Sequence, residues 1–201
     1  MTRKRPLTAL VALVLATEAC GGDSDPPPVP LSMAASAYAR VFCEKVYTCC
    51  NEPDRKVVLT AGADEIACRT NVAAAVSTRV LLFTDSVAQK RAVWNEQEAG
   101  ECFALYHSLA CIDARTPPPV CKAFLVPMVA QGAACAQHYE CIDGYCEGAV
   151  TDKKAGGCVS RKDMRAPCRV DAECKSGNCS ALHECIQPAL GALACGGGLR
   201  L

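Results

Sequence analysis

The cysteines carry the most reactive side chains of this sequence, and there are 17 of them among 201 residues. A cysteine can form a disulfide, hold a metal as a thiolate or act as a nucleophile. No two are separated by two residues, as zinc sites require, and Cys135 with His138 and His183 with Cys185 are the nearest approaches to a ligand pair. The spacing therefore favours disulfides, with no metal or other cofactor and no catalytic residue.

The composition favours the same chemistry. A cysteine content this high is typical of an exported disulfide scaffold and unlike that of a cytosolic enzyme. Basic and acidic residues balance at 21 each, so no excess charge favours nucleic acid as a partner. The motifs of serine hydrolases, zinc proteases and phosphate-binding loops are missing from the sequence. We expect a protein that is not an enzyme.

The N-terminus has the pattern of an export signal. Arg3, Lys4 and Arg5 precede a short apolar run at 7–16, which predicts a cleaved signal peptide over residues 1–19. The run that ends at Cys20 resembles the bacterial lipobox, although Thr17 and Glu18 depart from its preferred residues. The resemblance implies that Cys20 carries diacylglycerol and that the membrane is a partner through this lipid. Simple secretion after ordinary cleavage is the alternative.

Setting Cys20 aside leaves an even number of cysteines, which suits complete pairing. A proline run at 117–119 separates six of them in a first half, 34–116, from ten in a second half, 120–201, so each half can close its own bridges. Residues 20–33 are predicted to be the anchor and a stiff proline-rich tether. The expected disulfide cysteines are Cys43, Cys49, Cys50, Cys68, Cys102, Cys111, Cys121, Cys135, Cys141, Cys146, Cys158, Cys168, Cys174, Cys179, Cys185 and Cys195.

The first half has helical periodicity. Apolar residues recur at three- and four-residue steps over 34–50, where neighbouring Cys49 and Cys50 point in different directions and are expected to serve different partners. Residues 64–82 are alanine-rich and favour a helix, although 80–83 could be a short strand. Asn95 followed by Glu98 is typical of a helix start. We predict about three helices stapled by about three disulfides.

The second half contains a repeat with a period of 33 residues. Each copy has the spacing C-x5-C-x4-C, a glutamate before the second cysteine, a glycine before the third and a fourth cysteine after a variable gap. The glycines are expected to adopt positive φ in turns. The matching residues are Cys135, Glu140, Cys141, Gly144, Cys146 and Cys158 in the first copy, and Cys168, Glu173, Cys174, Gly177, Cys179 and Cys185 in the second.

These repeats resemble the Dickkopf N-terminal type of cysteine-rich module, a colipase-like pattern that recurs in bacterial cell-surface lipoproteins. The order of lipobox, proline tether, helical segment and tandem repeats is similar to that of myxobacterial lipoproteins. The resemblance implies a disulfide-rich small protein with a stapled α-helical N-terminal domain. Two tandem cysteine-rich knots of turns and short β-strands, at about 132–158 and 165–185, follow it.

Together these features predict a lipid-anchored protein of the bacterial envelope, at the outer membrane or cell surface, or else a secreted one. Its expected role is binding or structural, with another protein or envelope component as partner. The alternative is an inhibitor of secreted proteases that presents Lys153 and Lys154, or Arg161 and Lys162, as bait. Residues 125–130 are expected to form a strand that packs the repeats onto the helices. Cys195 could pair with Cys121 or another cysteine, or belong to a truncated third repeat.

Overall fold

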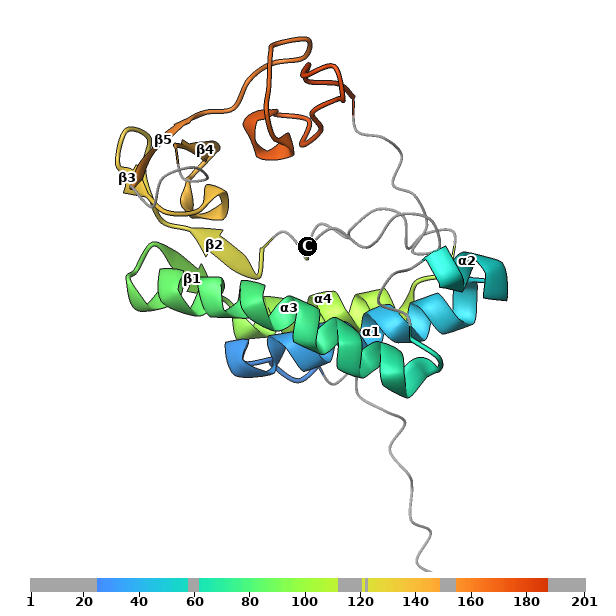
Figure 1. Ribbon diagram of the computed structural model, residues 1–201. Helices are drawn as coiled ribbons and strands as arrows, with labels where there is room; N and C mark the ends of the chain where they lie inside the picture. Colours follow the sequence, from blue (N-terminus) through green and yellow to red (C-terminus); the bar gives the residue numbers. More distant parts are fainter. Residues whose placement is uncertain (1–24, 58–61, 112–120, 122, 149–154, 188–201) are drawn as a thin grey trace, which may run out of the picture.

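A computed structural model describes residues 25–57, 62–111, 121, 123–148 and 155–187 (Figure 1). The first part of the chain is helical, and the second part is built of short strands, turns and disulfides. The molecule is therefore a disulfide-rich protein with a helical N-terminal region and small sheets, as the sequence predicts at this level.

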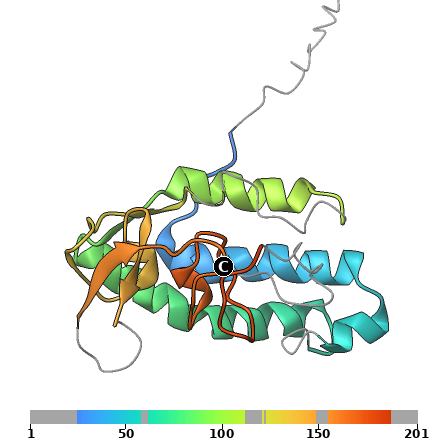
Figure 2. The same cartoon turned by 90° about the horizontal axis from the view of Figure 1, so that it is seen from above.

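Three long helices form the helical region. A short 3-10 turn, η1 (Leu31–Met33), leads into α1 (Ala34–Cys49), and the short α2 (Glu52–Val57) precedes α3 (Glu65–Ala88) and α4 (Glu96–Ser108). Helix α1 lies between α3 and α4 (Figure 2). Its Phe42, Cys43 and Val46 belong to an apolar cluster with Cys68 and Val72 of α3. Its Val41 faces the other way, toward a second cluster on α4.

Side-chain caps fix where the two later helices begin. The Asp64 carboxylate accepts a hydrogen bond from the Ala67 amide at 2.8 Å, and the Asn95 side chain accepts one from the Glu98 amide at 3.2 Å. The predicted helix start at Asn95 is thereby confirmed. Helix α3 continues through residues 80–83 to Ala88, so the alternative of a strand there is wrong.

A two-stranded sheet connects the helices to the second part of the chain. Strand β1 (Ala92–Trp94), which was not predicted, pairs antiparallel with β2 (Leu125–Pro127). The Trp94 and Phe124 rings are in contact beside it, 5.1 Å apart at their centroids. The expectation that residues 125–130 dock onto the helical region is thereby met.

A three-stranded antiparallel sheet follows, in the order β3 (Ala134–Cys135), β5 (Gly156–Ser160), β4 (Gly144–Glu147). The expectation that Gly144 adopts positive φ is wrong, because Asp143 takes that conformation in the turn, with φ of 51°. Gly144 is instead required by close approach, since a Cβ there would lie 2.5 Å from the Val159 carbonyl oxygen. Gly177, at φ 70°, behaves as predicted.

The proline-rich segment does not form a free tether along its whole length. Val29 exchanges hydrogen bonds with α4 and β1: its amide donates to the Glu96 carbonyl at 2.8 Å, and its own carbonyl accepts from the Trp94 indole at 2.9 Å. Pro27 lies so close to α4 that a Cβ on Gly100 would be 2.2 Å from the Pro27 carbonyl oxygen. From about residue 26 onward this segment belongs to the folded body, because its carbonyls satisfy donors of the helical region.

Among the described residues, α3 is the one helix long and apolar enough to cross a membrane by length and composition. A buried disulfide between Cys43 and Cys68 joins it to α1, and its Val72 packs into the first apolar cluster. Only 11% of its most apolar window is buried. We treat α3 as a helix of the helical region that leaves most of its surface uncovered.

Candidate functional site

Fourteen cysteines form seven described disulfides. The bonded pairs are Cys43–Cys68, Cys49–Cys111, Cys102–Cys121, Cys135–Cys146, Cys141–Cys158, Cys168–Cys179 and Cys174–Cys185. Cys50 is also disulfide-bonded, so every cysteine in the described ranges is oxidised. Cys49 and Cys50 have different partners, as their directions on the helix predicted. Cys20 and Cys195 lie outside the described residues.

The disulfides correct one expectation. Cys102 of α4 bonds to Cys121, which follows the proline run, so the two halves do not each close their own bridges. Cys121 packs with Phe103 and Phe124 in the second apolar cluster, and this packing brings it to α4. Pairing of Cys195 with Cys121 is excluded by the same bond.

The two repeats share their disulfide pattern and their backbone hydrogen bonds. In both, the first cysteine bonds to the third and the second to the fourth. The amide of Gly132 donates to the Cys158 carbonyl, and 33 residues later the amide of Arg165 donates to the Cys185 carbonyl. Arg165 has φ of 66° where Gly132 has 82°. The sequence mismatch at this position thus leaves the backbone conformation unchanged, although a left-handed φ is costly for arginine.

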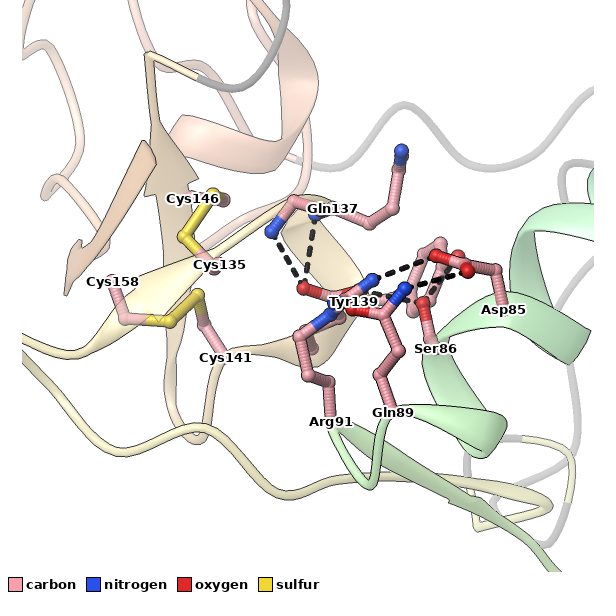
Figure 3. A network of polar contacts seen from close by, with 12 residues as sticks. Asp85, Ser86, Gln89, Arg91, Cys135, Gln137, Tyr139, Cys141, Cys146 and Cys158 are labelled. Carbon is pink, nitrogen blue, oxygen red and sulfur yellow. Dashed lines mark hydrogen bonds and ion pairs between the residues drawn. A yellow bond between two sulfur atoms is a disulfide. The ribbon is translucent and has the colours of Figure 1, made fainter. Parts of the chain in front are cut away.

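The carboxylate of Glu140 holds the first repeat against the end of α3 (Figure 3). Glu140 lies in the 3-10 turn η4 (His138–Glu140) and is fully buried. Its Oε1 accepts hydrogen bonds from the Ser86 hydroxyl at 2.5 Å and from Arg91 Nε at 2.8 Å. Its Oε2 accepts from the amides of Ala136 at 2.7 Å and Gln137 at 3.2 Å. We call this group the Glu140 clamp.

The clamp keeps the carboxylate charged. Burial by itself would raise the pKa of Glu140, but donors from Ser86, Ala136 and Arg91 outweigh that effect and lower the pKa below its ordinary value. Arg91 also donates to Asp85 at 2.9 Å and contacts Gln89, so the guanidinium is fixed on α3 and the loop after it. The contacts join a charged pair with every carboxylate oxygen satisfied, which makes this a structural junction.

Glu173 has the equivalent position in the second repeat, on the 3-10 turn η5 (Asp171–Glu173). Its carboxylate accepts from Lys162 Nζ at 2.6 Å, and this hydrogen bond raises the pKa of Lys162. Lys162 belongs to the segment that connects the two repeats. Each glutamate therefore receives a cation from the chain that precedes its own repeat, and the first repeat alone is clamped to a helix.

A concave surface of about 270 Å³ lies between the repeats, beside β4 and η5. Its lining residues are His138, Tyr145, Cys146, Glu147, Gly148, Lys162, Arg169, Val170 and Glu173. The two basic and two acidic groups balance, and Lys162 is occupied by Glu173. His138 Nδ1 is buried without a hydrogen-bond partner, and burial lowers the pKa of His138, so the ring is held neutral.

The described residues do not assemble a catalytic or metal-binding group. Cys135, Cys141 and Cys146 have their sulfur atoms close together, and so do Cys168, Cys174 and Cys179, but all six are oxidised. A disulfide sulfur offers neither a thiolate ligand nor a thiol nucleophile. His107 lies on α4 and pairs with Glu44 at 2.8 Å in an exposed position.

Sequence reasoning missed the Glu140 clamp. The glutamate repeated at positions 140 and 173 was visible, but its partners were not, because Ser86 and Arg91 come from a helix end about 50 residues away. A glutamate that recurs before a cysteine in two short repeats is the signal that could have indicated a buried carboxylate. Of the two proposed protease baits, Lys153 and Lys154 lie outside the described residues.

Comparison of the chain with protein-family models, with curated proteins and with solved structures finds no match.

Proposed function

We propose that this chain is an exported protein of the bacterial envelope, anchored through a lipid on Cys20, with a binding or structural role and no catalysis. The observation that carries the proposal is the oxidised state of every cysteine in the described part of the chain. Disulfides persist in exported proteins and are rare in the cytosol. The apolar run at 7–16 and the lipobox-like residues before Cys20 support the anchor.

We further propose that the repeats are two tandem cysteine-rich modules of the Dickkopf N-terminal type. Their shared bonding pattern and their shared hydrogen bonds to residues 158 and 185 support this assignment. The modules hold their shape through disulfides, because their buried clusters consist largely of cysteine. Their loops are the expected contact surface for another protein or an envelope component.

The anchor has a direct test. Cys20→Ser removes the only acceptor for the lipid and should move the protein from the membrane fraction to the soluble fraction. Labelling with a palmitate analogue should mark the unchanged protein and leave Cys20→Ser unlabelled. A membrane-bound, labelled Cys20→Ser protein would exclude the anchor.

Lipidation of Cys20 would also determine one disulfide. Cys20, Cys50 and Cys195 are the cysteines outside the seven described pairs, and Cys50 is bonded. With Cys20 acylated, Cys195 is the cysteine left for Cys50. Linked peptides that contain both residues would support the anchor, whereas a Cys20–Cys50 peptide would contradict it.

The inhibitor alternative has less support. Arg161 Nε donates to the Gly144 carbonyl at 3.0 Å, and Lys162 Nζ donates to Glu173 and to the Pro167 carbonyl. A bait residue must project its side chain into a protease pocket, and these two side chains are bound to the protein itself. Incubation with a panel of secreted proteases should give resistance to cleavage without inhibition.

A further inference from the structure

We propose that the outward face of α3 is the interface of an antiparallel homodimer. Six residues on this face follow one another at alternating steps of four and three, the spacing of a helix-packing seam. We call them the outer seam: Thr70, Ala74, Ser77, Leu81, Thr84 and Ala88, all of them exposed. Leu81, at its middle, is 69% exposed.

The outer seam lies on the side of α3 opposite to α1. Cys68 and Val72 face α1 and are almost completely buried, with exposures of 0% and 3%. At about 100° per residue, the seam residues lie on the other half of the helix surface. α4 is separated from α3 by α1, and the N-terminal segment packs on α4 (Figure 2). The described residues thus leave the seam uncovered.

The seam offers almost no polar obstacle to burial, although half of its residues carry hydroxyl groups. Thr70, Ser77 and Thr84 each donate to a carbonyl of their own helix, four residues earlier, at 3.1, 2.7 and 2.8 Å. A hydroxyl that is already satisfied within its helix can be covered at small cost. The seam therefore presents methyl groups, alanines and one leucine.

The charges of α3 lie off the seam. Glu65 pairs with Arg69, and Asp85 pairs with Arg91. These pairs and Arg79 leave no charged residue among the six seam positions. A helix that lies on a membrane surface is expected to carry an excess of lysine and arginine beside its apolar face. The acidic and basic residues of α3 are equal in number, so a lipid surface is not the occupant that this helix fits.

A second copy in antiparallel orientation complements the seam in size. Leu81 of one copy then lies opposite Ser77 of the other, Ala74 opposite Thr84 and Ala88 opposite Thr70. Each layer combines the leucine or an alanine with a small hydroxyl residue, which lets the helix backbones approach closely. In a parallel pair the two Leu81 side chains would meet, and the alanine layers above and below them would leave gaps.

The rows that flank the seam match in the same arrangement. On one side Ala73, Val80 and Val87 of both copies face each other, so apolar groups meet apolar groups. On the other side Asn71 of one copy lies opposite Asp85 of its partner, an amide donor beside a carboxylate. This agreement of size and polarity on both flanks selects a second copy over an unrelated partner.

The dimer is expected to be weak. Helix α3 has 24 residues, so its face is about 36 Å long. A single helix pair of small residues buries less than the roughly 800 Å² per partner of a standard interface. We therefore expect a dissociation constant of roughly micromolar magnitude.

Analytical ultracentrifugation of the oxidised protein that carries Cys20→Ser tests the interface without detergent. The protein should change from monomer to dimer between about 1 μM and about 1 mM. Leu81→Arg places two charges in the seam and should leave a monomer. Leu182→Arg makes the same change at a leucine that is 84% exposed in the second repeat and should still dimerise.

Two further readouts keep the test decisive. Circular dichroism and a free-thiol count should show that both arginine variants fold, and Ala74→Glu should repeat the loss of dimer if one does not. A photo-crosslinking residue at position 81 should label the peptide that contains Ser77 of the partner copy. A monomer at every concentration, a Leu81→Arg dimer, crosslinks between the two positions 81, or binding of the monomer to lipid vesicles would each overturn the proposal.

Discussion

At the residue scale, the repeats show how one backbone accommodates different side chains. The position three residues before the first cysteine is left-handed in both copies, as Gly132 in one and as Arg165 in the other. The sequence shows the mismatch, but only the hydrogen bonds to residues 158 and 185 reveal that the turn is the same. Arg165 therefore holds a conformation that glycine adopts more easily.

Arg165→Gly should stabilise the second repeat. Relief of the left-handed strain exceeds the extra chain entropy of glycine and should raise the free energy of unfolding by about 0.5 to 1 kcal/mol. Arg165→Ala removes the same side chain, keeps the strain and is the control. Thermal melting of the oxidised proteins measures the difference. A gain of equal size in both variants would place the effect in the side chain.

Glu140 is the most consequential single side chain of the junction. Glu140→Gln puts an amide donor against the donors Arg91 and Ser86 and should cost about 2 to 4 kcal/mol of stability. Glu173→Gln is the matched change in the second repeat. It should cost about 1 kcal/mol, because Lys162 is partly exposed. Denaturant unfolding followed by Trp94 fluorescence, beside the junction, measures both.

The same residue predicts a pH dependence. The folded-state pKa of Glu140 is lower than its ordinary value of 4.5, so its contribution is complete above that value and lost as the pH falls through the folded pKa. The difference in stability between the unchanged protein and Glu140→Gln should therefore shrink on acidification below about pH 4.5. A difference that stays constant down to pH 2 would contradict the clamp.

At the element scale, local patterns predicted helices well and the pairing of distant segments poorly. The start of α1, the Asn95 cap and the helical character of 64–82 followed from apolar spacing and capping residues. Strand β1 has only three residues, too few for a period, and it exists because β2 reaches it from more than 30 residues away. The disulfide across the proline run was missed for the same reason, since packing of Cys121 with aromatic rings decides it.

The contact between β4 and β5 makes a test at this scale. Gly144→Ala would bring a methyl group against the Val159 carbonyl, so the strands must separate and stability should fall by about 1 to 3 kcal/mol. Gly157→Ala is the control on the facing strand, because nothing lies within 4 Å of its added Cβ. Amide hydrogen exchange in residues 156–160 should accelerate in the first variant and not in the second.

At the scale of the whole molecule, the docked proline segment changes the picture that the sequence suggested. Residues 26–30 pack on α4, so the chain between a lipid on Cys20 and the folded body would be short, at most about 20 Å when extended. Under the proposed anchor, α4 lies nearer to the membrane than α3 does, and the outer seam stays available to a second copy.

The central claim is an exported chain whose cysteines are all used, one for lipid and the others in disulfides. Peptide mapping of protein purified from its own envelope under non-reducing conditions, with thiols alkylated before digestion, tests it most directly. The account predicts the seven described linked pairs, a Cys50–Cys195 peptide and an acylated N-terminal Cys20. Alkylated cysteines within the two repeats, or a Cys20 that is free or disulfide-linked, would contradict it.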